Sequence, residues 1–197
     1  MKRRDFLKCS AAALLGLSVP GLLGEESRAY ARPIPGWEPP IQKRFFRFTE
    51  YEKRPGTEFL VIHHTGFPNE DKDSIAADIH KFHQETNGWA GIGYHYLIRK
   101  NGMIEQGRRP DAVGAHALHY NSTSIGICLA GNFEIGKPTR KQMESLKILS
   151  AWLCQKYKLD PMKKGVIVGH RDLNDTDCPG NSLYRQLGDV RWFCRNF

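Results

Sequence analysis

Apolar residues along the chain form short strand-like runs separated by longer helical periodicities. The run Phe59–His64 is apolar up to its two final histidines, which is typical of a strand buried on both faces. Shorter apolar or alternating segments predict further strands at residues 92–98, 103–106, 124–130 and 166–168. Asn101-Gly102 separates the first two of these segments and predicts a tight hairpin turn between them.

Three segments have the periodicity of amphipathic helices: residues 73–86, 139–157 and 183–193. In the first, Ile75, Ile79 and Phe82 fall on one face. In the second, Thr139 and Gln142 form a capping box at the start. Because strands and helices alternate, the pattern predicts an α/β fold, a single domain with a central mixed β-sheet flanked by about three α-helices. A chain of 197 residues is long enough for one such core.

The first thirty-one residues are patterned as an export signal. Basic residues at positions 2–4 precede a modestly apolar run at 11–23, and Ala29-Tyr30-Ala31 offers a small-residue cleavage site. The string Arg3-Arg4-Asp5-Phe6-Leu7-Lys8 resembles the twin-arginine export motif of bacteria. We therefore predict a twin-arginine-type signal peptide at 1–31 and an exported protein, periplasmic or secreted, with no integral membrane anchor after cleavage. A basic cytoplasmic arm is the alternative.

The chain after residue 31 begins with a proline-rich stretch and carries excess positive charge. Residues 32–50 predict an extended Pro-rich arm, and residues 51–197 form the domain proper. Residues 32–197 carry 24 Lys and Arg against 18 Asp and Glu, and this net charge of +6 suits an anionic partner such as nucleic acid, acidic lipid or cell wall. The sequence contains no run of five Lys or Arg and no zinc-finger spacing, which argues against nucleic acid.

Four cysteines follow residue 31: Cys128, Cys154, Cys178 and Cys194. They include no Cys-x-x-Cys pair, which argues against a four-cysteine structural zinc site. Cys154 and Cys194 lie on predicted helices, and an exported protein would allow a disulfide between them; two reduced thiols are the alternative. Cys128 lies in an apolar strand and is predicted to be a small core residue.

His63, His170 and Cys178 form an unusual set at the ends of predicted strands. His63 is near the end of the first core strand, His170 follows the strand at 166–168, and Cys178 comes eight residues later in a loop. Two imidazoles and a thiolate are good zinc ligands, and a three-ligand set leaves a fourth position open for water, as in catalytic sites. His63 and His64 point to opposite faces of a strand, so at most one enters this site, and the spacing leaves open which.

Six short motifs, each weak alone, occur in order along the chain: Val61-Ile62-His63-His64-Thr65, Gly91-Ile92-Gly93-Tyr94-His95-Tyr96, Gly114-Ala115-His116-Ala117, Ser124-Ile125-Gly126-Ile127, Gly169-His170-Arg171-Asp172 and Thr176-Asp177-Cys178-Pro179-Gly180. Together they resemble the type-2 N-acetylmuramoyl-L-alanine amidases and, within that family, the peptidoglycan recognition proteins. The resemblance extends from about Phe59 to Tyr184. It implies a peptidoglycan recognition protein-like fold and makes 51–197 a zinc amidase domain.

The resemblance implies a role for each member of the site. It makes His63, His170 and Cys178 the ligands of Zn²⁺ and Tyr94 the catalytic tyrosine, which orients the attacking water or donates a hydrogen bond to the oxyanion. Thr176 is the second catalytic candidate, with a hydroxyl where phage members of the family carry Lys. The implied enzyme is a zinc-dependent hydrolase that cleaves the amide between N-acetylmuramic acid and L-alanine and so degrades or remodels peptidoglycan.

The resemblance also implies a partner and a groove to bind it. His116 and Asn121 are similar to positions that line the substrate groove. Arg108 is a candidate for gripping stem-peptide carboxylates by bidentate pairing, with a solvated turn as the alternative. The implied partner is peptidoglycan or muropeptides, with no nucleic acid, and we expect a monomer. The alternative function is a non-catalytic peptidoglycan-recognition protein, against which the complete His-His-Cys set with Tyr94 argues.

His80 and His83 are predicted to be structural or surface residues, not metal ligands. His80 and His83 stand three apart on the first predicted helix, where they could imitate a metal-binding pair. Alternation in the second predicted strand puts Tyr94 and Tyr96 on one face and His95 on the other. We therefore expect His95 to face away from the site.

Overall fold

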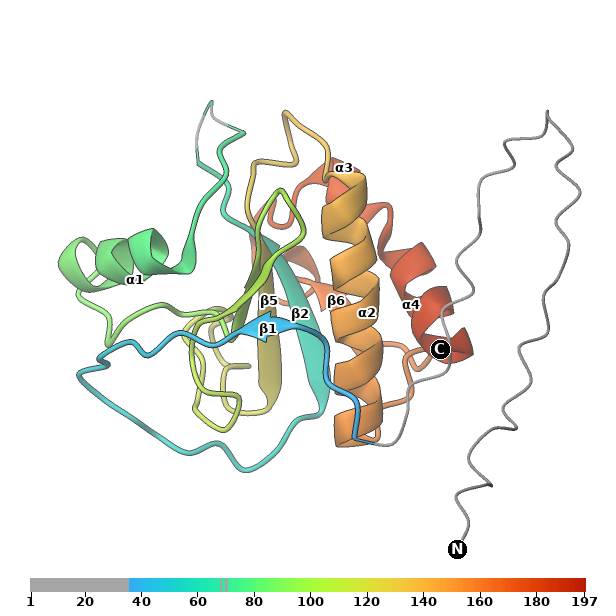
Figure 1. Ribbon diagram of the computed structural model, residues 1–197, viewed down its shortest axis with the longest axis horizontal. Helices are drawn as coiled ribbons and strands as arrows, with labels where there is room; N and C mark the ends of the chain where they lie inside the picture. Colours follow the sequence, from blue (N-terminus) through green and yellow to red (C-terminus); the bar gives the residue numbers. More distant parts are fainter. Residues whose placement is uncertain (1–35, 68, 70) are drawn as a thin grey trace, which may run out of the picture. The chain divides into compact units, whose positions relative to one another are not determined.

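The computed structural model describes residues 36–67, 69 and 71–197, and the predicted signal peptide lies outside this range. The elements follow the predicted alternation (Figure 1). The strands are β1 (Ile41–Gln42), β2 (Phe59–His64), β3 (Tyr96–Ile98), β4 (Ile104–Gln106), β5 (Ser124–Leu129) and β6 (Ile167–Gly169). The helices are α1 (Ala76–Glu85), α2 (Arg140–Tyr157), α3 (Asn181–Tyr184) and α4 (Leu187–Asn196), with the 3-10 turn η1 (His170–Asp172) after β6. Among these residues, no helix has the length and apolar character needed to cross a membrane.

A six-stranded mixed sheet forms the centre of the fold. Its order is β1-β4-β3-β5-β2-β6, and β4 pairs antiparallel with β3 while the other pairs are parallel. β2 pairs along its whole length with β5, in a register that puts His63 beside Cys128. The predicted hairpin turn is present, with Gly102 at a φ of 86°, a conformation that favours glycine. The predicted α/β domain with one mixed sheet is confirmed.

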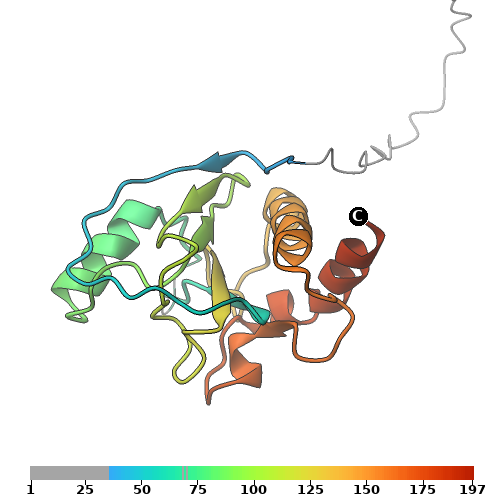
Figure 2. The same cartoon turned by 90° about the horizontal axis from the view of Figure 1, so that it is seen from below.

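Helices cover both faces of the sheet, α2 and α4 on one face and α1 on the other (Figures 1 and 2). α2 begins with the predicted capping box, in which the side chains of Thr139 and Gln142 bond each other's backbone N–H groups. Leu146 and Leu149 of α2 are fully buried in the larger core between this helix and the sheet. Because that core covers one face of β2, alternate side chains of the strand, including His63, point to the other face of the sheet.

Two helix predictions need correction. In α1, Ile79 is buried as predicted, but Phe82 is 44% exposed, and the helix turns His80 and His83 inward instead. These histidines are buried because their rings accept hydrogen bonds from backbone N–H groups, which makes them tolerable core residues. The single helix predicted at 183–193 is two helices, α3 and α4, separated by a break at residues 185–186.

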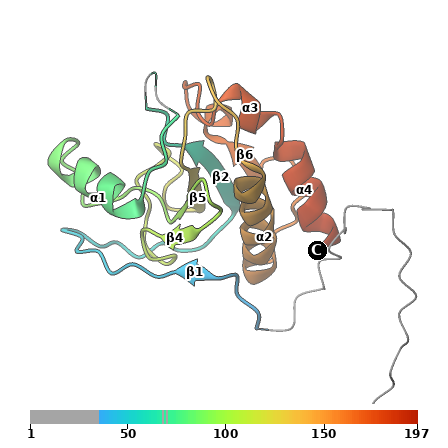
Figure 3. The same ribbon diagram turned by 45° about the horizontal axis from the view of Figure 1, so that its top comes forward.

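The described part of the Pro-rich arm contributes an edge strand to the sheet. β1 pairs with β4, with Ile41 beside Ile104 (Figure 3). Arg44 then forms a 2.6 Å ion pair with Glu105, whose side chain is fully buried. The other oxygen of Glu105 accepts a 2.8 Å hydrogen bond from the Ala76 backbone N–H at the start of α1. Glu105 therefore ties the arm and α1 to the same edge of the sheet.

Candidate metal centre

Three side chains with metal-binding atoms converge at one end of the sheet. His63 lies near the end of β2, His170 begins η1 directly after β6, and Cys178 lies in the following loop. Because β2 and β6 are parallel neighbours, their ends bring the rings of His63 and His170 to a centroid distance of 4.6 Å. Cys178 Sγ lies 3.6 Å from His63 Nδ1. One ligand atom from each of the three residues lies within 4.8 Å of the other two, which suits binding of a single ion.

The neighbouring histidine, His64, lies on the opposite face of β2. Its Nδ1 accepts a 3.1 Å hydrogen bond from the Phe133 backbone N–H, and the two rings pack at 6.0 Å. The His64 backbone N–H in turn donates to Cys178 Sγ at 3.5 Å. Alternation left open which histidine enters the site, and the structure places His63 there. His64 supports the thiol through its backbone.

Hydrogen bonds to the far nitrogens fix how both histidine rings are turned. His63 Nε2 lies 3.1 Å from His116 Nδ1, and His170 Nε2 lies 3.1 Å from Asn174 Oδ1. These contacts leave Nδ1 of each ring for an ion, and partners of this kind set the tautomer of histidine ligands. Sequence reasoning missed Asn174. Its only signal is its place four residues after His170 in the same turn.

Burial keeps the side chains of His63 and Cys178 uncharged. Burial and the neighbouring His170 lower the pKa of His63 well below its usual range, and burial raises the pKa of the Cys178 thiol to about 12. In the protein alone, the imidazole of His63 is therefore neutral and the thiol protonated at neutral pH. A bound divalent cation would change the protonation of Cys178, because a thiol that coordinates a metal ion loses its proton. Two neutral imidazoles and one thiolate fit zinc, and the ion itself stays a prediction.

Tyr94 lies beside these residues, although the strand geometry predicted for it is wrong. β3 begins only at Tyr96, and a bend at His95 interrupts the alternation. Tyr96 consequently packs into the larger core, whereas Tyr94 packs on the face towards α1. The Tyr94 ring lies 5.2 Å from the His63 ring. Burial raises the pKa of Tyr94 well above its usual range, so the phenol keeps its proton and can act as a hydrogen-bond donor.

Two buried histidines of α1 hold the backbone that precedes Tyr94. His80 Nδ1 accepts a 3.2 Å bond from the Ile92 N–H, and His83 Nδ1 accepts a 3.0 Å bond from the Gly93 N–H. Burial lowers the pKa of both rings, to about 4 for His83, so both are neutral acceptors near pH 7. The prediction that these histidines are structural is confirmed, and their contacts position Tyr94.

One of the three metal-binding residues, His170, lines a surface cavity of about 590 Å³, called here the groove. Its lining includes Trp89, His116, Leu118, Asn121, His170 and Thr176. Thr176 Oγ1 accepts a 3.2 Å hydrogen bond from the Cys178 N–H, which holds the ligand loop. Asn121 Oδ1 accepts bonds from the N–H groups of His116 and Ala117, at 2.8 and 2.9 Å. The groove therefore brings together four predicted site residues: His116, Asn121, His170 and Thr176.

Comparison with known proteins identifies the family. The sequence profile described as N-acetylmuramoyl-L-alanine amidase matches residues 52–181, well over half of the chain. The chain belongs to this family. The predicted family is thereby confirmed, and the match supports the predicted amidase activity.

Relatives and solved structures of this amidase family agree with the assignment. Peptidoglycan-recognition protein LB of Drosophila melanogaster is 36% identical over 134 residues, which span 66% of this chain but only 57% of that protein. The endolysin of Klebsiella phage KP32 is 35% identical over 141 residues, 69% of this chain and 89% of the endolysin. Among solved structures, N-acetylmuramoyl-L-alanine amidase LysC from Clostridium intestinale has a TM-score of 0.69 and 34% identity, covering 77% of this chain and 97% of LysC.

Arg108, the candidate for gripping stem-peptide carboxylates, lies outside the groove. It lines a separate cavity of about 410 Å³ that shares Trp89 and Ala115 with the groove. Arg108 is 9% exposed, with Nε donating to Ile92 O at 2.8 Å and Nη1 donating to Val113 O at 2.7 Å. Two of its donors therefore brace backbone, and the structure does not bring Arg108 to the metal centre.

The alternation predicted that His95 faces away from the metal centre, and this prediction is wrong. It is fully buried, and its ring lies 5.5 Å from that of His116, which contacts His63. His95 Nδ1 accepts a 3.0 Å bond from the Gly126 N–H, and Nε2 lies 3.0 Å from Ala112 O. A Cβ added at Gly126 would lie 2.6 Å from the His116 ring. This glycine makes room for the packed histidines, and it is the signal that sequence reasoning passed over.

Proposed function

We propose that this chain is an exported, zinc-dependent hydrolase that cleaves the amide between N-acetylmuramic acid and L-alanine in peptidoglycan. The observation that carries the proposal is the convergence of His63, His170 and Cys178 beside Tyr94, with His170 lining a groove of about 590 Å³. Membership of the amidase family supports the same bond as target. Export rests on the signal peptide predicted at 1–31.

The protein's own groups have distinct tasks in this proposal. His63, His170 and Cys178 would hold zinc, which when bound supplies Lewis-acid chemistry by polarising the scissile carbonyl and activating water. If Nδ1 of His63 held the ion, its Nε2 would carry the proton and would donate the 3.1 Å hydrogen bond to His116 Nδ1. His116 Nε2 is buried and has no partner among the described residues, so the ring is anchored through His63.

Tyr94 is the best placed donor for the charge that develops during cleavage. Its phenol stays protonated because burial raises its pKa, and its ring lies against His63. A donor held in advance beside a developing oxyanion stabilises the transition state more than the ground state. Thr176 lines the groove next to the Cys178 backbone, where its hydroxyl can position water or the substrate amide.

The test is digestion of purified sacculi by the zinc-loaded chain, followed by mass spectrometry of the products. We expect free stem peptides with L-alanine at their amino ends and about one zinc per chain. Cys178→Ser should lose both cleavage and zinc. The matched control is Cys154→Ser, which makes the same change in the core away from the groove and should retain both. Full cleavage by metal-free protein would refute the proposal.

A non-catalytic recognition protein is the second candidate, supported by the similarity to peptidoglycan-recognition protein LB. The same digestion separates the two functions, because a recognition protein would retain sacculi in a pull-down and release no peptide. The presence of Cys178 together with Tyr94 favours the enzyme. A recognition role needs neither a metal-binding thiol nor a donor placed beside it.

A further inference from the structure

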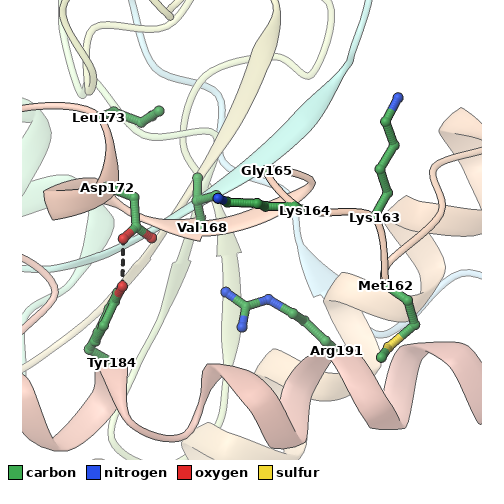
Figure 4. A pocket seen from close by; sticks show the side chains of 9 residues that line it. All are labelled: Met162, Lys163, Lys164, Gly165, Val168, Asp172, Leu173, Tyr184 and Arg191. Carbon is green, nitrogen blue, oxygen red and sulfur yellow. Dashed lines mark hydrogen bonds between the residues drawn. The ribbon is translucent and has the colours of Figure 1, made fainter.

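A second cavity, of about 560 Å³, lies beside edge strand β6 and is lined by none of the metal-binding residues. Figure 4 shows it between the loop before β6, the turn η1 and helix α4. Its walls include Lys163, Lys164, Val168, Asp172, Tyr184 and Arg191. We call it the β6 pocket. Three of these six side chains carry positive charge and one carries negative charge.

The carboxylate oxygens of Asp172 in the β6 pocket are already used by local hydrogen bonds, and its single negative charge is outnumbered by the three cations. One oxygen of Asp172 accepts a 2.8 Å bond from the Gly169 N–H, and the other accepts a bond from the Tyr184 hydroxyl. Neither Lys163 nor Lys164 has an ion-pair partner among the described residues. The pocket is therefore electropositive and suited to an anionic ligand.

Backbone hydrogen bonds hold the chain on both sides of Lys164, at residues 163 and 166. The Lys163 N–H donates to Asp160 O at 3.1 Å, and the Val166 N–H donates to Lys163 O at 3.2 Å. Val166 O in turn accepts a 2.7 Å bond from the Leu60 N–H of β2. In Figure 4 the ammonium group of Lys164 and the guanidinium of Arg191 point into the same space, while Lys163 points away.

The donors that are left favour one kind of anion. Arg191 directs Nε and Nη2 to Ile167 O, at 2.9 and 2.7 Å, which leaves both hydrogens of Nη1 and the second hydrogen of Nη2 for a ligand. This end of the guanidinium is offered to the pocket together with the compact charge of Lys164. A phosphate has enough oxygens to accept from the guanidinium end and from the ammonium group together, whereas the two oxygens of a carboxylate are used by a bidentate arginine alone.

We propose that the β6 pocket binds a phosphate group, and that its source is a phosphodiester-bearing polymer of the cell wall. The choice of source rests on the proposed wall function. A wall polymer is also favoured over a membrane lipid, because a protein that binds a lipid surface usually inserts several apolar side chains into it. In this lining Met162 is the one exposed large hydrophobic residue among the described residues. The pocket borders η1, whose first residue is His170, so a bound polymer would keep the groove close to the wall.

The first experiment titrates the zinc-loaded full chain with inorganic phosphate, followed by phosphorus NMR. Lys164→Gln should weaken binding about tenfold, equivalent to about 1.4 kcal/mol. The matched control is Lys163→Gln, which removes the same charge one residue away and should weaken binding less than about threefold. Both variants leave the metal ligands intact, so phosphate bound at the metal would be unaffected. Equal effects of the two substitutions would overturn the pocket.

The second experiment identifies the source of the phosphate. Co-sedimentation is measured with sacculi that retain their phosphodiester-linked polymers, with sacculi stripped of them, and with phosphatidylglycerol vesicles. We expect retention on the first alone, reduced by Lys164→Gln but not by Lys163→Gln. Retention on vesicles, or equal retention on both sacculi, would overturn the wall source. Cleavage of a small soluble muropeptide should be the same in both variants, so failure here is distinguishable from failure of the amidase proposal.

Discussion

The burial of His95 predicts a measurable dependence of stability on pH. Its side chain is fully buried, and both ring nitrogens are used: Nδ1 accepts from the Gly126 N–H and Nε2 faces Ala112 O. A second ring proton would point at the Gly126 N–H. Burial, with the charges of Arg54 and Arg108, accordingly lowers the pKa of His95 to about 3. The folded protein holds this ring neutral where the unfolded chain protonates it.

The sign and size of the effect follow from proton linkage. The unfolded pKa of histidine is about 6.5, so the contribution of His95 to stability is complete above that pH and is lost as the pH falls towards the folded value. Between about pH 6.5 and about pH 4.5 the unfolded state binds the proton and the folded state does not. Two pH units then cost about 2.7 kcal/mol in the free energy of unfolding.

The assay is urea unfolding of wild type and His95→Gln at about pH 7 and about pH 4.5, within the range where two-state analysis applies. Other titrating groups contribute equally to both proteins and cancel in the difference. Wild type should lose about 2–3 kcal/mol more than the variant. His119→Gln, at an exposed position, is the control and should follow wild type. An identical pH dependence in wild type and His95→Gln would refute the reasoning.

Further predictions concern the groove and its support. Tyr94→Phe keeps the ring but removes the donor, so steady-state kinetics should show kcat reduced about 10²-fold with little change in KM. His83→Leu removes the acceptor for the Gly93 N–H; it should lower kcat while zinc content measured by atomic absorption stays unchanged, and loss of zinc would contradict a role confined to Tyr94. Chelation should lower the melting temperature in calorimetry, because an ion at a thousand times its Kd stabilises the fold by about 4 kcal/mol; an unchanged melting temperature would show that no ion is bound.

The sequence predicted best those elements whose burial leaves little choice. β2 and β5 are buried on both faces, and the capping box at Thr139 marks the start of α2. β1 could not be foreseen, because a two-residue edge strand has no periodicity. The inward face of α1 was missed for a different reason. Hydropathy treats His80 and His83 as polar, whereas each becomes a core residue once its ring accepts a backbone N–H.

For the site, local spacing identified the residue types and tertiary structure decided their directions. Which of His63 and His64 joins His170 and Cys178 depends on which face of β2 is covered by α2, and the sequence of the strand alone does not determine that. Tyr94 was predicted to share a face with Tyr96, but the bend at His95 separates them. The resemblance to the amidases identified both His63 and Tyr94 as members of one site, and their rings do lie side by side. It did not predict the backbone conformation that brings Tyr94 there.

The placement of β6 has a consequence for when an ion can enter. Among the described residues, β6 follows the other five strands in the chain and lies at the edge of the sheet beside β2. A nascent chain that stops short of it has His63 but neither His170 nor Cys178, so it has one of the three ligands. If the chain binds zinc as proposed, metal uptake would follow the pairing of β6 with β2 and would take no part in nucleating the sheet. Metal content would then report whether β6 and the loop after it have docked in a given molecule.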